Sequence, residues 1–533
     1  MTAHPERPGR GGAASAPADP PRLVRGVRLV PVAAAGAGAP QPVPDHPVDL
    51  RLRGGVVTEV GPGLRAEVDE EVLDGEGRWA APGLWDAHVH MVQWVKTAGR
   101  LDVSASQRPE DVVRILTDHL ASGEAGNGFV FGWGYRSAVW DRQPTVAELD
   151  AASPDRPVVM ISGDVHNGWL NTRALELLGL GGVDGVGGRT GTLQENEWFD
   201  ALPRLEQLAG ASGRSHAGVE SAVRAAAARG VVGMVDMEFG TAHTDWPDRV
   251  AAGITQLRVR TATYAATLAD VIASGWRTGD PIPGGAGLIT MGPLKIIGDG
   301  SLNTRTACCT HPYADASHLD LPRGRMNQSP EELRRLLSEG TAAGLEVALH
   351  AIGDAALTAA LDAFEATGAR GSIEHAQLVD LAQIPRMARL GIRASVQPWH
   401  LIDDRDVTEQ CWPDHLARCF PFASLHRAGV ALTLGSDAPV APLDPWRALA
   451  AAVHRSDDER DPWNPAEALT AAQALAASTD GAGTLGVGSR ADLILLDADP
   501  LAPQEDSRAL AAHLRDLAVA TTLVEGRVTH DAR

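Results

Sequence analysis

The sequence predicts an α/β protein with a TIM-like (β/α)8 barrel, a small β domain built from both chain ends, and a long insert. Three observations predict this fold. Eight short apolar segments alternate with Ala- and Leu-rich helical stretches, strand-like segments lie at both chain ends, and residues from about 92 to 229 separate the first apolar segment from the second. Alternating strands and helices build a parallel sheet, and eight such units fit a closed barrel. A doubly wound open sheet is the alternative.

The two chain ends have the pattern of short strands broken by turns. The N-terminal segments are "RLVRGVRLVPV", "VDLRLRGGVVTEVG" and "EEVLDGEGRWAAPG", with turn signals in "RGG" and "DGEG". The C-terminal segments are "ADLILLDADP" and "LAVATTLVEGRVTH". We therefore expect one small domain formed by residues 23–80 and 484–533, around an interior domain of residues 81–483. Residues 1–22, biased to Pro, Gly and Ala, predict a disordered tail.

The interior supplies the eight barrel segments. They are "GLWDAHVHM", "GVVGMVDM", "QLRVRTATY", "MGPLKIIGDG", "LEVALHAIG", "GSIEHAQLV", "GIRASVQP" and "VALTLGSDAP". Helical stretches lie between them, and one at 329–344 opens with Ser329 as N-cap, Pro330 at the first helical position and Glu332 two residues later. The insert holds many of the tryptophans, which either line a pocket over the barrel mouth or pack the insert's own core.

Composition excludes several classes of protein. The chain has 533 residues, 44% of them hydrophobic and 22% charged, as in a globular protein. A net charge of −21 argues against a nucleic-acid or anionic-membrane surface. There is no long apolar run and no apolar core of a signal peptide. The four cysteines form no CxxC pair, which favours a reducing compartment, and we expect a cytoplasmic protein.

A histidine pair ends the first barrel segment, in "APGLWDAHVHM". Side chains at i and i+2 of a strand point to the same face, so His88 and His90 would project together. Their Cα atoms would lie about 6.6 Å apart. Two imidazoles that converge in this way can bind one metal ion, but the pair alone is a weak signal.

Four further ionisable residues stand where apolar segments end. They are Lys295 in "GPLKIIGDGS", His350 in "VALH", His375 in "SIEHAQL" and Asp437 in "LTLGSDAP". The carboxyl ends of barrel strands meet at one face, where the active sites of such barrels lie. Because uncompensated burial of six such groups would be costly, a shared metal site accounts for them together with the histidine pair.

These motifs resemble the amidohydrolase superfamily, in its YtcJ-like (amidohydrolase 3) branch, which includes N-substituted formamide deformylases. "LDGEGRWAAPGLWDAHVHM", "LKIIGDGSLNTRTA", "ALHAIGDAA", "IEHAQL", "GSDAPVAPLDP" and "GSRADLILLDADPL" are similar to that branch and follow the same order. The resemblance covers nearly all of the chain after about residue 23. It implies a barrel with a flanking β-sandwich and a hydrolytic centre of one or two divalent metal ions.

The resemblance also implies roles for the strand-end residues. His88, His90, His350 and His375 would hold the metal ions. Imidazole and carboxylate ligands favour zinc, with iron or manganese as alternatives. Asp437 would be both a ligand and the group that takes a proton from water and passes it to the leaving amine.

Lys295 differs from the other five residues because a protonated lysine repels cations. The resemblance implies that it is carboxylated by CO₂ and bridges the metal ions. Burial and like charge would both lower the pKa of its amine and so favour this reaction. Alternatively, the amine extends to solvent or pairs with Asp299.

Three residues are weaker candidates for substrate contact. His166 lies in the insert and Arg305 lies in "SLNTRTA", and both have loop packing or a solvated charge as the alternative. Trp85 stands where an aliphatic residue is common in the superfamily, which affects the shape of the pocket.

The sequence therefore predicts a metal-dependent amidohydrolase that hydrolyses a non-peptide C–N bond, of amide or N-substituted formamide type. Its partner would be a small-molecule amide, with neither nucleic acid nor membrane, and a homo-oligomer is left open. A deaminase-type enzyme with one metal ion and a non-catalytic scaffold of the same fold are the alternatives. Metal content separates the three.

Overall fold

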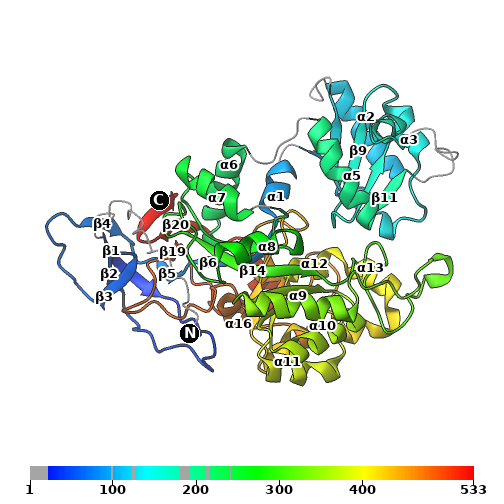
Figure 1. Ribbon diagram of the computed structural model, residues 1–533. Helices are drawn as coiled ribbons and strands as arrows, with labels where there is room; N and C mark the ends of the chain where they lie inside the picture. The colour runs from blue at the N-terminus through cyan, green and yellow to red at the C-terminus, as the bar shows by residue number, and fades with distance from the viewer. Residues whose placement is uncertain (1–21, 98–99, 123–127, 181–190, 210–214, 241) are drawn as a thin grey trace, which may run out of the picture.

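A computed structural model describes residues 22–97, 100–122, 128–180, 191–209, 215–240 and 242–533. Its centre is a sheet of eight parallel strands in the order β18-β17-β16-β15-β14-β13-β12-β6 (Figure 1). The strands are β6 (Leu84–Val89), β12 (Val231–Asp236), β13 (Arg258–Thr263), β14 (Ile289–Ile297), β15 (Val347–Ala351), β16 (Gly371–His375), β17 (Arg393–Val396) and β18 (Leu432–Leu434). The expected tail at 1–22 lies outside the described residues, except that Arg22 begins a strand.

The first and last strands of this sheet approach each other and nearly close the barrel. Val89 and Ala438 form a parallel bridge, and the Asp437 backbone N–H donates to the His88 carbonyl at 2.7 Å. Neighbouring strands also follow one another in the sequence, with no reversal of direction along the sheet. A doubly wound sheet needs such a reversal, so that alternative was wrong.

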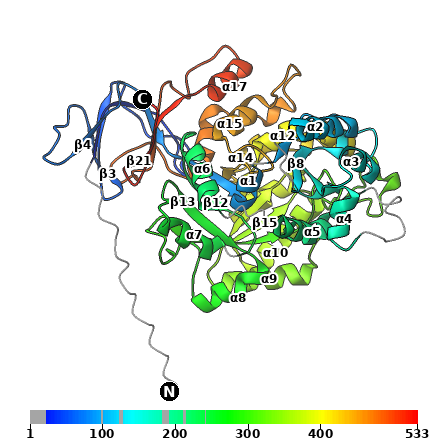
Figure 2. The same cartoon turned by 90° about the horizontal axis from the view of Figure 1, so that it is seen from above.

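Helices connect consecutive barrel strands on the outer side (Figures 1 and 2). They include α6 (His216–Ala227), α7 (Ala242–Ala251), α8 (Ala265–Ser274), α9 (Pro330–Ala342), α10 (Asp354–Thr367) and α11 (Ile384–Leu390), and α15 (Pro445–His454) follows the last strand. The predicted start of α9 is confirmed. Pro330 is its first residue, and the Ser329 hydroxyl accepts the N–H of Glu332 at 3.2 Å.

The two chain ends meet in a second sheet of eight strands, drawn in blue and red in Figure 1. Its order is β21-β20-β19-β5-β1-β2-β3, with β4 on β1. The strands are β1 (Arg22–Leu29), β2 (Val48–Arg53), β3 (Val56–Gly61), β4 (Glu71–Asp74), β5 (Trp79–Pro82), β19 (Leu493–Leu496), β20 (Val519–Val524) and β21 (Arg527–Asp531). Antiparallel pairing of β5 with β19 joins the two ends. The two-layered sandwich and the domain boundaries at 80 and 484 stay predictions.

A separate lobe follows the first barrel strand and the short helix α1 (Met91–Thr97) (Figure 1). Its five-stranded sheet has the order β11-β10-β9-β8-β7. The strands are β7 (Leu101–Asp102), β8 (Val130–Tyr135), β9 (Val158–Ser162), β10 (Asn167–Leu170) and β11 (Thr192–Gln194), with helices α2 (Pro109–Ser122), α3 (Val146–Ala152), α4 (Thr172–Leu177) and α5 (Glu195–Leu208). We call β7 to α5 the insert lobe. Trp140, Trp169 and Trp198 are buried in its own apolar cores.

In the described part of the chain, no helix is long and apolar enough to cross a bilayer.

Candidate metal centre and its cavity

All six predicted strand-end residues line one cavity of about 860 Å³. Five strands or strand ends deliver them: His88 and His90 at the end of β6, Lys295 on β14, His350 on β15, His375 as the last residue of β16, and Asp437 just after β18. The insert lobe supplies part of the opposite wall through Trp133, His166, Phe199 and Leu202. The structure thus brings together the six residues that the sequence singled out.

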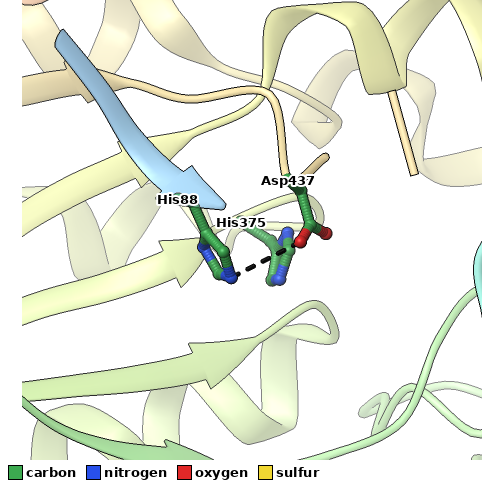
Figure 3. Close-up of side chains that lie close together, drawn as sticks. All are labelled: His88, His375 and Asp437. Atoms are coloured by element: carbon green, nitrogen blue, oxygen red, sulfur yellow. Dashed lines mark ion pairs between the residues drawn. The ribbon is translucent and has the colours of Figure 1, made fainter. Parts of the chain in front are cut away.

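Three of the six form a close group at the barrel mouth (Figure 3). One possible ligand atom from each of His88, His375 and Asp437 lies within 4.8 Å of the others. His88 Nε2 is 3.5 Å from Asp437 Oδ1, and the rings of His88 and His375 are 5.2 Å apart, centre to centre. This spacing is suited to one small cation between the three side chains.

The other three residues border this group. His90 Nε2 lies 3.4 Å from Asp437 Oδ1, and the His350 ring lies 4.5 Å from that of His375. Lys295 Nζ is 3.1 Å from His88 Nε2, and only 3% of the residue is exposed. The alternative in which Lys295 reaches solvent or pairs with Asp299 is therefore wrong.

Two carboxylates that the sequence analysis missed as orienting groups fix the histidine rings. Glu374 Oε2 lies 2.8 Å from His88 Nδ1, and Asp299 Oδ1 lies 3.0 Å from His350 Nδ1. Each carboxylate accepts a hydrogen bond from Nδ1, so Nε2 is the nitrogen that remains for a metal ion. The Asp299 carboxylate also accepts the backbone N–H groups of Ile352 and Gly353.

Backbone conformation re-aims two of the candidate ligands. His375 has φ 71° and Asp437 has φ 58°, both in the left-handed region that residues other than glycine seldom adopt. Such strain persists only where the surrounding structure enforces it, and it is often found at functional sites. Here it turns the last residue of β16 and the residue after β18 toward the same cavity.

Burial and neighbouring charges set the protonation of the group. Burial, together with the Lys295 charge, lowers the pKa of His88 to about 4. Burial would raise the pKa of Asp437, but the nearby imidazoles of His88, His90 and His375 outweigh it and hold that pKa well below its usual range. The site therefore offers a neutral imidazole at His88 and a carboxylate anion at Asp437, which are the forms that bind metal ions.

Burial also lowers the pKa of Lys295, as expected from the sequence. The second expected cause, repulsion by bound cations, stays a prediction. The charges that affect Lys295 are the carboxylates of Glu374 and Asp437, and both raise its pKa.

Unpartnered nitrogen atoms test whether a metal ion fits this site. His90 Nδ1, His375 Nδ1 and His400 Nε2 are buried without a hydrogen-bond partner among the described residues. A buried polar atom left unsatisfied costs about 1–3 kcal/mol, so three in one cluster require a compensating ligand. Imidazole nitrogens beside a carboxylate are donors typical of zinc, and the residues present fit a divalent cation.

His400 is a further site residue that the sequence analysis missed. It lies on α12 (Pro398–Asp403), and its ring stacks on that of His375 with centres 5.8 Å apart. Its Nε2 lies 3.9 Å from Asp437 Oδ2. His400 follows "QPW", which comes directly after β17. Because it lies outside the barrel strand, it did not stand out as a strand-end residue.

The three candidates for substrate contact have different positions. His166 lines the cavity, on the turn between β9 and β10. The Arg305 guanidinium is held by Asp315 and by the carbonyls of Asn303 and Ala138, and it does not line the cavity. Arg305 therefore holds a loop, and its expected substrate contact is corrected.

Trp85 is likewise corrected. Trp85 lies three residues before His88 on the same strand. It is therefore about 10 Å from His88 along the strand, and its side chain points to the opposite face. Its ring packs against the guanidinium of Arg260, 4.5 Å from the ring centre, and near that of Arg490. It borders a smaller hollow between the barrel and the terminal sheet, away from the strand-end residues.

Comparison with known proteins agrees with this arrangement. The model of the amidohydrolase family matches residues 71–530, which is most of the chain. The chain belongs to the amidohydrolase family. Because its members are hydrolases and the barrel carries a His/Asp cluster at its mouth, the protein is a hydrolase with a candidate metal site.

Relatives support the family over most of the chain's length. The chain is 27% identical to N-substituted formamide deformylase of Arthrobacter pascens, over 87% of this chain and 91% of that protein. It is 26% identical to YtcJ of Bacillus subtilis (strain 168), with the same coverage. A crystal structure of an uncharacterized metal-dependent hydrolase from Pyrococcus horikoshii OT3 matches with a TM-score of 0.72 and 25% identity, over 91% of this chain and 99% of that one.

Proposed function

We propose that the protein is a metal-dependent amidohydrolase that hydrolyses a non-peptide C–N bond in a small-molecule amide or N-substituted formamide. The observation that carries this proposal is the convergence of the six strand-end residues on one cavity, with unpartnered imidazole nitrogens among them. The similarity of the chain to a formamide deformylase and to a metal-dependent hydrolase supports the same function.

His88, His90, His350, His375 and Asp437 would hold the cation or cations, and carboxylates already orient two of them, His88 and His350. A divalent metal ion bound there would lower the pKa of water toward 7 and polarise the substrate carbonyl. Asp437 accepts the proton of the attacking water and donates it to the departing amine nitrogen. Its low pKa keeps the carboxylate ionised.

Lys295 takes part as a carbamate in this proposal. Its buried amine is 3.1 Å from His88 Nε2, and its pKa is lowered by burial, which favours the neutral amine that reacts with CO₂. The carbamate would be an anionic ligand, in place of an ammonium group that repels metal ions.

One observation favours a second candidate, a deaminase-type enzyme with a single ion. Among the described residues, only His88, His375 and Asp437 lie close enough together to form a ready three-ligand group. In that case His90 and Lys295 would act on the substrate or on the water instead. The number of bound ions separates the two candidates.

The experiment that tests the proposal measures amine release by zinc-loaded protein from a panel of N-formyl amines, N-acyl amines and dipeptides. We expect turnover of at least one N-formyl or N-acyl amine, and loss of roughly 10²–10⁴-fold in kcat for Asp437→Asn with folding unchanged. Turnover of dipeptides alone would contradict the non-peptide specificity. A kcat that Asp437→Asn leaves unchanged would contradict the role of Asp437.

A further inference from the structure

The insert lobe places one histidine on the cavity wall that faces the barrel. His166 lies between β9 and β10, and its ring centre is 6.5 Å from that of His350, on the barrel side. Phe199 packs edge-on against the His166 ring, at 5.4 Å between centres. His166 is therefore held close to the candidate metal centre but belongs to a different lobe.

A buried carboxylate fixes the orientation of this ring. His166 Nδ1 lies 3.1–3.2 Å from both oxygens of Glu195, the first residue of α5. The Glu195 backbone N–H also donates to the His166 carbonyl at 2.9 Å. Because the Nδ1 edge is used by Glu195, the Nε2 edge is the one that remains for the cavity.

The barrel in turn fixes Glu195. The hydroxyls of Thr304 and Thr306, in the loop after β14, donate to Glu195 Oε1 at 2.6 and 2.7 Å. A second bond ties the loop after β14 to the turn that carries His166, since the Ser301 hydroxyl donates to Asp164 at 2.8 Å. The position of His166 thus depends on contacts that cross from the barrel to the insert lobe.

The contacts of Glu195 leave one edge of the His166 ring for a ligand. The Glu195 carboxylate accepts a hydrogen bond from His166 Nδ1 and from the hydroxyls of Thr304 and Thr306. His166 lines the cavity, so a substrate oxygen there can accept a hydrogen bond from the opposite, Nε2, edge of the ring.

We infer that His166 is a catalytic residue of the insert lobe, which donates a hydrogen bond from Nε2 to the carbonyl oxygen of the substrate. Glu195 is the positioning residue that holds the ring. The inference rests on the proposed function, because it assigns the substrate a carbonyl whose oxygen gains negative charge during attack. A donor aimed at that oxygen stabilises the transition state more than the ground state. The insert lobe then completes the active site.

Two variants test the inference by kinetics. His166→Gln should lower kcat by roughly 10²–10³-fold, as for loss of one oxyanion donor, with a small change in KM and with zinc content unchanged. Glu195→Gln should give a smaller loss of kcat, because the ring remains but its orientation is freed. His243→Gln is the control, since this buried histidine on α7 packs against Trp276 outside the cavity. Wild-type kcat in His166→Gln would overturn the inference.

A binding measurement needs no turnover and separates this inference from the proposed function. Phenylphosphonate, a tetrahedral anion, is titrated into zinc-loaded protein and its Kd is measured by calorimetry. We expect a Kd about 10–100-fold higher in His166→Gln than in wild type and His243→Gln, as for loss of one charged hydrogen bond. Equal Kd values would overturn the role of His166. An inactive wild type with a His166-dependent Kd would overturn the proposed reaction alone.

A change of fold would be recognised in the same samples. A purely structural tie between lobes would lower the melting temperature and the zinc content of His166→Gln and Glu195→Gln together, and that outcome would also overturn the catalytic role. If His166→Gln does not fold, the kcat of Glu195→Gln tests the inference instead. In that variant a kcat equal to wild type would contradict the positioning of His166 by Glu195.

Discussion

At the scale of single residues, the candidate ligands depend on neighbours that hold their rings. His88 is oriented by Glu374, and His350 is oriented by Asp299. The Glu374 carboxylate has a pKa of about 2, since its bond to His88 and the nearby charges of His88 and Lys295 outweigh burial. It therefore stays an anion and keeps the proton on His88 Nδ1.

Glu374→Gln tests this orientation. The amide loses the charge that holds the His88 proton on Nδ1, so we expect zinc affinity to fall by about 10–100-fold with the fold intact. The zinc Kd, measured by competition with a chelator, checks this value. Glu365→Gln is the control, because Glu365 is an exposed residue of α10 that pairs with Arg386 at the surface. Equal zinc Kd values in both variants would contradict the account.

The strand-end residues could be predicted because each follows an apolar run, where parallel strands end at one face. Glu374 could not. Adjacent residues of a strand point to opposite faces, so Glu374 and His375 should not both reach the barrel interior. The left-handed backbone of His375 breaks that alternation. Side-chain direction also explains why Trp85 was wrongly linked to the pocket. It lies three residues before His88, so the two side chains point to opposite faces.

At the scale of elements, local sequence signals were sufficient for the barrel strands and for the start of α9. Ser329 caps that helix through the Glu332 N–H, as its sequence indicates. The elements of the insert lobe were harder to assign to a function. Their tryptophans pack the lobe's cores or line the cavity according to contacts that no local pattern encodes.

Ser329→Ala tests the contribution of this cap. Loss of an N-cap hydroxyl costs about 1 kcal/mol, so amide hydrogen exchange in the first turn of α9 should quicken by about fivefold. Hydrogen exchange with mass spectrometry measures it. Ser274→Ala is the control, since Ser274 ends α8 and its hydroxyl donates to the Asp270 carbonyl in its own helix. Unchanged exchange in Ser329→Ala would show that the cap contributes nothing.

At the scale of the whole molecule, function depends on contacts between distant segments. The terminal sheet joins β5 to β19, and the cavity joins the barrel to the insert lobe. The repeated strand-like pattern at both ends indicated that they meet, but it could not give the pairing. Nor could it place His166 opposite His350, because that position depends on bonds between Glu195 and the loop after β14.

The central claim is that the strand-end residues bind a catalytic metal ion, and metal content tests it most directly. Zinc per chain is measured by mass spectrometry after reconstitution and desalting, with amine release from the same samples. We expect one or two ions in wild type and in His426→Ala, an exposed histidine on α14 (Phe422–Arg427). His88→Ala and His90→Ala should lose most of the zinc and nearly all activity. Full zinc content with wild-type turnover in both variants would contradict the account.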